Sequence, residues 1–239
     1  MFTAAALVSA PPLLIPELAG GAATETADLR AASVAAAQHL AARARRWTVL
    51  GVGGTEAEYG PDTLGTFAGF GADVRVQLGG ADPTASPAPA VPLAVLVAGW
   101  LRAQADPTVV ADAIVLAADT SPVYCADVGA ALRSRLDATA EPHGVLVVGD
   151  GATTLTAKAP GAFDDRAPEV QRELDAALTA GNLEFLRQLD PVACADLGIE
   201  GRAAWQVLAG LFGDDAPRCR TDYQGAPYGV GYHVGTWEL

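Results

Sequence analysis

Short apolar segments alternate with longer helix-like segments along most of this chain, and this alternation restricts the fold more than any other feature. Four nearly continuous apolar runs, each about one strand long, lie at residues 2–8, 47–52, 113–118 and 144–148. Strands of this kind are typical of a parallel sheet that is covered on both faces. We therefore expect an α/β fold with a largely parallel or mixed central sheet and helices on both faces.

The intervening segments predict the other elements of the fold. Helices are expected at residues 26–46, 93–104, 125–138, 167–180, 183–189 and 202–211. Additional strands are expected at 73–78, 218–224 and 228–237, and the glycine-rich segment 53–71 is expected to be irregular. No linker of convincing length separates two halves, so we expect one domain over residues 1–239. Residues 79–92 carry four prolines and predict a surface loop, the segment that we most expect to be disordered.

The net charge and the cysteine content restrict the possible partners and the expected cellular compartment. The net charge of -13 opposes binding to nucleic acid and to anionic lipid headgroups. No apolar run approaches the roughly 20 residues that a membrane-spanning helix needs. The three cysteines, Cys125, Cys194 and Cys219, form no CxxC motif and no even-numbered disulfide framework. We therefore expect a cytoplasmic protein with free thiols.

The loops that follow the predicted parallel strands are the expected place for a ligand. These loops cover residues 9–17, 53–59, 119–121 and 149–154. The candidate cleft-lining residues are Ala10, Glu17, Thr55, Glu56, Asp119, Thr153 and Tyr228. Asp150, between Gly149 and Gly151, is the best polar candidate for catalysis, although an Asp-Gly turn also binds its own backbone amides.

Only three histidines are present. His39 is expected on an exposed helix surface, and His143 in a turn at the opposite end of the sheet from the cleft. His233 lies in an alternating segment, on the opposite face from Tyr232 and Val234. We expect it to be a hydrogen-bonded structural histidine, and it is also the one histidine that we place near a functional cleft as a catalytic candidate.

Three common catalytic or nucleotide-binding motifs are missing. Residues 51–56 follow a strand, but Glu56 stands where a dinucleotide fingerprint needs glycine, and no helix is expected next. The chain has no phosphate-binding P-loop motif and no GxSxG nucleophile elbow.

Several segments together resemble the LigB-type class III extradiol dioxygenases, a superfamily that also includes the Memo-like proteins. The resemblance rests on Ala-Pro-Pro-Leu-Leu at residues 10–14 and on residues 49–54, 65–71, 149–151, 159–161 and 226–232. They are similar to a bacterial, alanine-rich branch of subunit-B-like proteins. The resemblance implies the LigB-like α/β fold. It also implies an iron(II) cofactor held by a histidine after the first strand, a second histidine after the second strand and a carboxylate, with a further histidine as acid–base catalyst.

The sequence departs from that pattern at each histidine. Ala10 stands at the first position, residues 53–56 contain no histidine, and the turn that carries a histidine in active relatives is Gly149–Thr153 here. Alanine cannot bind a metal, so we expect no metal ligands, no cofactor and no ring-cleaving turnover.

Three functions are therefore compared. The first is an extradiol-dioxygenase-like protein with a degenerate iron site that binds a small molecule in the cleft at the strand carboxyl ends. The second is an enzyme with a rebuilt metal or acid–base site that uses Asp150, Glu56, Glu17 or His233. The third is a non-catalytic structural or interaction protein that forms a homo-oligomer.

Overall fold

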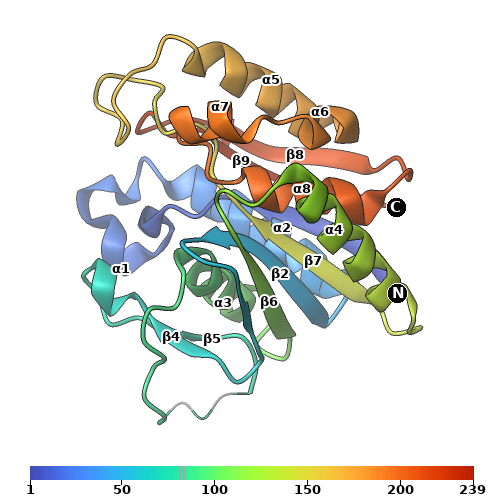
Figure 1. Ribbon diagram of the computed structural model, residues 1–239. Helices are drawn as coiled ribbons and strands as arrows, with labels where there is room; N and C mark the ends of the chain where they lie inside the picture. Colours follow the sequence, from blue (N-terminus) through green and yellow to red (C-terminus); the bar gives the residue numbers. More distant parts are fainter. Residues whose placement is uncertain (81, 83) are drawn as a thin grey trace.

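A mixed seven-stranded sheet forms the centre of the computed structural model, which describes residues 1–80, 82 and 84–239 (Figure 1). The four central strands are parallel and lie in the order β6 (Val110–Ala117), β2 (Arg46–Gly53), β7 (His143–Val148) and β1 (Phe2–Val8). Three antiparallel strands complete the edges, β3 (Ala57–Tyr59) beside β6, and β9 (Tyr232–Glu238) then β8 (Arg218–Gly225) beside β1. The expected α/β fold with a mixed sheet is confirmed.

Helices cover both faces of this sheet, each over its own apolar core. The helices α2 (Ala27–Arg43) and α3 (Leu93–Ala105) pack on one face. The opposite face carries α4 (Pro122–Asp137), α5 (Ala167–Ala180), α6 (Leu183–Arg187), α7 (Pro191–Asp196) and α8 (Arg202–Phe212). Strand β1 serves both cores, because Ala4 and Ala6 face α2 and α3 whereas Ala5 and Leu7 face the other layer.

The helices α4 and α8 lie against each other in front of the sheet (Figure 1). Glycines allow this close contact. A Cβ atom at Gly129 would lie 2.2 Å from the Val207 carbonyl oxygen, and one at Gly210 would lie 2.5 Å from the Ala126 carbonyl oxygen. The backbones therefore meet directly, which positions the first turn of α8 at the carboxyl end of the sheet.

Several helix and strand limits differ from the sequence predictions for local reasons. The helix α2 ends at Arg43 rather than at 46, because Ala44 is extended and Arg46 already belongs to β2. The helix α4 begins at Pro122, three residues before the expected start, because the Ser121 hydroxyl accepts the Tyr124 N–H at 3.2 Å. The last strand, β9, begins at Tyr232 rather than at 228.

The segment 53–71 is not irregular, and that prediction was wrong. It contains β3, β4 (Leu64–Thr66) and a 3-10 turn at Phe67–Phe70, and β4 pairs with β5 (Arg75–Gln77) in a separate two-stranded sheet. Three-residue strands depend on their tertiary partners and leave little local signal. The helix α7 and the short helical turns α1 (Pro16–Ala19), Pro12–Leu14 and Gly20–Ala23 were also not predicted.

In the predicted loop 79–92, the described residues form neither helix nor strand, while residues 81 and 83 lie outside the described residues. Among the helices that the structure describes, none has the length and apolar character needed to cross a membrane.

Candidate functional site

The carboxyl ends of β1 and β7 lie side by side, and the structure brings Ala10 and Asp150 together there. The Asp150 Oδ1 atom accepts the Ala10 N–H at 2.7 Å. The Asp150 carbonyl oxygen accepts the Gly201 N–H at 2.9 Å, which ties this loop to the start of α8. Asp150 is therefore a shared anchor for two strands and one helix.

The environment of Asp150 alters its proton affinity. Burial raises the pKa of its carboxyl to about 7, and the negative charge of Glu200 acts in the same direction. The Ala10 N–H and the Ser9 hydroxyl stabilise the carboxylate and oppose this rise. The residue keeps some exposed surface. A partly exposed carboxyl with this pKa can exchange a proton near neutral pH.

Gln171 of α5 holds the same loop from behind, and the sequence analysis did not identify it. Its Oε1 atom accepts the Ala152 N–H at 2.8 Å, and its Nε2 atom donates to Asp175 Oδ1 at 2.8 Å. A Cβ atom at Gly151 or Gly231 would lie 2.2 or 2.3 Å from the Gln171 side chain. The two glycines were the available sequence signal, because they make room for this amide.

The other predicted cleft residues are spread over the rim. Glu17 and Thr55 are exposed, and the Glu56 carboxylate accepts the Tyr124 hydroxyl at 2.8 Å. The Thr153 N–H binds the Leu197 carbonyl oxygen at 3.0 Å. Tyr228 is partly exposed, and the neighbouring Glu25 raises the pKa of its phenol.

His233 lies in β9 with its side chain in the core rather than at the rim. Its backbone N–H binds the Ser9 hydroxyl at 3.2 Å. Both ring nitrogens are buried and lack a hydrogen-bond partner in the described part of the chain, so the expected hydrogen-bonded ring is not found. Burial lowers the pKa of His233 to about 4, which keeps the ring neutral at neutral pH.

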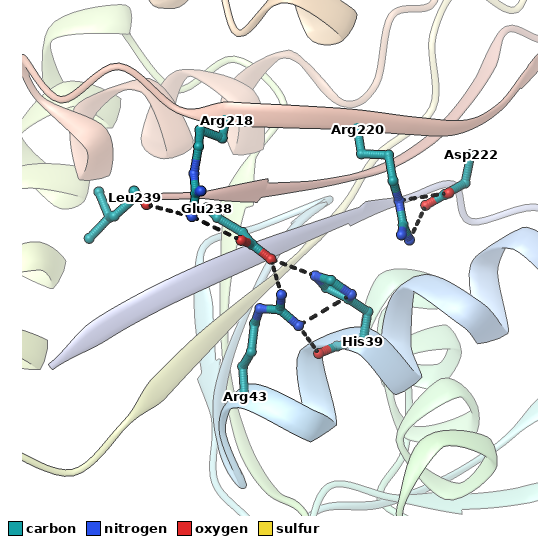
Figure 2. A network of polar contacts seen from close by, with 7 residues as sticks. All are labelled: His39, Arg43, Arg218, Arg220, Asp222, Glu238 and Leu239. Atoms are coloured by element: carbon teal, nitrogen blue, oxygen red, sulfur yellow. Dashed lines mark hydrogen bonds and ion pairs between the residues drawn. The ribbon is translucent and has the colours of Figure 1, made fainter.

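The other two histidines lie away from this edge, as expected. His39 of α2 contacts Glu238 at 2.8 Å, and Arg43 and Arg218 contact the same carboxylate (Figure 2). His143 is the first residue of β7, and its ring lies 3.0 Å from the Thr48 hydroxyl.

The residues at this edge do not fit an iron(II) centre with two histidines and one carboxylate. Ala10 offers no donor, Glu56 is bonded to Tyr124, and the His233 ring is buried. Across the described residues, no group of three or more His, Cys, Asp and Glu side chains is arranged to hold a metal ion. The four residues of the rebuilt-site hypothesis thus do not form such a group.

A cavity of about 610 Å³ opens at the carboxyl end of β6. Asp119 lies on it, as the sequence predicts for a residue that follows a parallel strand. Pro191, Val192 and Ile199 give the wall apolar character, and Cys194 also lines it. Burial raises the pKa of the Cys194 thiol to about 11, so the thiol is neutral.

Arg202, the first residue of α8, also lines this cavity and was not recognised in the sequence. Only 2% of its surface is exposed. One terminal nitrogen donates to the carbonyl oxygens of Ala118 and Thr120 at 2.6 and 2.7 Å, and the other donates to Gln206 Oε1 at 2.6 Å. Arg202 therefore joins the loop after β6 to α8.

Comparison with known proteins bears on the fold. No family model matches the chain, and no curated protein is similar to it in sequence. Among solved structures, it resembles the uncharacterized protein JW3007 from Escherichia coli K12 with a TM-score of 0.53 and 11% sequence identity. The similarity covers 98% of this chain and 99% of that chain, so the two share the overall fold.

Proposed function

We propose that this chain is an extradiol-dioxygenase-like protein that performs no ring cleavage and binds a small organic molecule at the carboxyl ends of its strands. The observation that carries the binding proposal is the cavity of about 610 Å³ beside Asp119. Its size and its mixture of apolar walls with a few polar groups are typical of small-molecule sites. Its place at a strand end agrees with the general rule for open α/β sheets.

The side chains at the carboxyl ends of β1 and β7 support the proposed lack of ring cleavage. Extradiol cleavage needs a metal ion that holds substrate and oxygen together, and Ala10 cannot contribute a ligand. Anaerobic loading with iron(II), followed by metal analysis and oxygen uptake with catechols, tests this part. We expect no stoichiometric metal and no uptake; one equivalent of iron with catechol-dependent uptake contradicts the proposal.

The binding proposal is tested by a thermal-shift screen of small organic molecules on the full chain. Ala195 lies on the cavity and is exposed, so Ala195→Phe fills the space without disturbing the core. Compounds that raise Tm of the wild type are expected to lose their effect in this variant. Ala180→Phe, at an exposed position of α5 outside the cavity, is the control. Equal shifts in all three proteins place binding elsewhere.

A second candidate function is acid–base catalysis by Asp150. It is favoured by one observation, a partly exposed carboxyl at a strand end with a pKa raised to about 7. A substrate found by the screen would then turn over with a pH dependence near 7 that Asp150→Asn removes. Turnover that is unchanged in this variant excludes the role.

A further inference from the structure

We propose that the cavity beside β6 takes a small organic monocarboxylate, whose charge is matched by the buried guanidinium of Arg202. This inference rests on the proposed small-molecule function and names the chemical class of the ligand.

The first observation is that Arg202 lacks a counter-ion. Its three oxygen partners are two backbone carbonyls and the Gln206 amide, all of them neutral. Arg202 also acts on the thiols of Cys125 and Cys194, both of which have a pKa raised by burial. Within the described chain, no carboxylate lies within ion-pair distance of Arg202. A buried cation without an anion is costly, and guanidinium groups match carboxylates in shape.

The second observation concerns the position of Arg202 in its helix. It is the first residue of α8, and this helix has no capping side chain and no acidic residue in its first turn. The dipole of an eleven-residue helix makes this end positive, so that the arginine charge adds to it. Helix N-termini and arginine side chains both favour an anion at the same place.

The cavity itself selects among anions. Pro191, Val192 and Ile199 supply apolar surface that suits a hydrocarbon body. Three exposed acidic residues also line it, Asp119, Asp196 and Glu200, of which Asp196 is paired with Arg166. Their carboxylates repel a multiply charged anion more strongly than a singly charged one. One negative charge near Arg202, followed by an apolar chain, satisfies both conditions. Inorganic phosphate satisfies only the first.

Hexanoate and its neutral analogue hexanamide test the charge requirement on the full-length protein. We expect hexanoate to bind the wild type at least tenfold more tightly than hexanamide by isothermal titration, and phosphate not to compete. The cavity-filling variant Ala195→Phe locates binding, since Ala195 lines the cavity. Hexanoate is expected to bind this variant several-fold more weakly than the wild type, and to bind Ala180→Phe, which lies outside the cavity, as tightly as the wild type.

Two variants test the role of charge in ligand binding separately from the fit of the ligand in the cavity. Arg202→Gln is expected to abolish the preference for hexanoate while hexanamide binding persists. Asp119→Asn, at an exposed position that tolerates substitution, is expected to tighten hexanoate about twofold by removing a like charge. If Arg202→Gln does not fold, the relative affinities of hexanoate and hexanamide for the wild type and for Asp119→Asn still test the charge requirement.

The outcomes distinguish this inference from the proposed function. Equal affinity for hexanoate and hexanamide, with the binding of both weakened in Ala195→Phe, overturns the carboxylate proposal and keeps the cavity as a binding site. Competition by phosphate with the same affinity as hexanoate also overturns it. Absence of binding by either compound overturns it as well, and the wider thermal-shift screen then decides the proposed function separately.

Discussion

Two buried arginines on opposite faces of the sheet have different electrostatic surroundings. Arg102 lies in the last turn of α3, where it donates to the backbone carbonyl oxygens of Val109 and Pro107. Arg202 begins α8 and also binds backbone carbonyl oxygens. Burial lowers the pKa of Arg102, and the charge of the neighbouring Asp106 opposes this effect. Neither arginine forms an ion pair in the described part of the chain.

The helix ends sharpen the contrast. A cation in the last turn of a helix is stabilised by the helix dipole, and a cation at the first residue is destabilised. Arg102 is therefore explained by the fold alone, because it joins the end of α3 to the loop before β6. Arg202 performs a similar linking role at an electrostatic cost, and it lines a cavity. The binding role that we propose for Arg202 would account for this difference.

Substitution of each arginine by leucine gives the largest expected effect. Arg102→Leu leaves buried carbonyl oxygens unpaired and is expected to lower the free energy of unfolding by about 4 kcal/mol. Arg202→Leu leaves similar groups unpaired but removes an unfavourable charge, so we expect about half that loss. Urea unfolding at pH 7 measures both, with exposed Arg172→Leu as control. An equal or larger loss at Arg202 contradicts the comparison.

His233 extends the comparison to a buried polar group without any side-chain partner. Its folded pKa of about 4 lies below the ordinary 6.5, so the unfolded chain takes up a proton first as the pH falls. The wild type should therefore lose stability between pH 6.5 and 4, relative to His233→Leu, by about 3 kcal/mol. At pH 7 the variant should already be the more stable of the two by about 1 kcal/mol, because leucine removes the two buried nitrogens that lack a partner. If the free energies of unfolding of the wild type and His233→Leu instead change in parallel over this pH range, the His233 ring is solvated.

Asp150 is a partly exposed acidic group beside the start of α8. Its folded pKa of about 7 lies above the ordinary 3.8, so its contribution to stability is complete below pH 4 and is lost as the pH rises toward 7. Asp150→Asn keeps the acceptor for the Ala10 N–H and removes the titration. Because the residue is partly exposed, we expect the variant to gain about 2 kcal/mol over the wild type between pH 4 and 7.5. Urea unfolding across this range measures the gap, and a constant gap contradicts the raised pKa.

The sequence predicted those elements whose signals are local. The strand Phe2–Val8 and the helix Ala167–Ala180 have the predicted limits, and the helix ends at Gly181, whose φ of +66° favours glycine. The short strands β3 and β4 were missed, because three residues leave little local signal and each strand depends on its partner, the distant β6 for β3 and the nearby β5 for β4.

In the candidate site, too, the sequence predicted only the residues that carry a local signal. Asp150 was identified because a strand end and two glycines mark it in the sequence. Arg202 was not, since an arginine at a helix start usually belongs to the surface. Its burial depends on the Ala118 carbonyl oxygen, 84 residues away in the chain. Local patterns therefore located the sheet edge, but not the charge beside its cavity.

The smallest expected effect on stability comes from arginines that are exposed to solvent and paired with a carboxylate. Burial tends to raise the pKa of Glu238, but the hydrogen bond from His39 and the charges of Arg43 and Arg218 lower it overall (Figure 2). Glu238→Gln should cost about 1 kcal/mol at pH 7, less in 1 M salt and less still as the pH falls through 4.5. Asp73→Asn, which removes an exposed pair with Arg75, should cost less than half as much. Urea unfolding in low and high salt measures both losses. If Glu238→Gln instead lowers the free energy of unfolding by about 4 kcal/mol, this partly exposed ion pair contributes as much as a buried arginine. The electrostatic contrast drawn for Arg202 would then lose its basis.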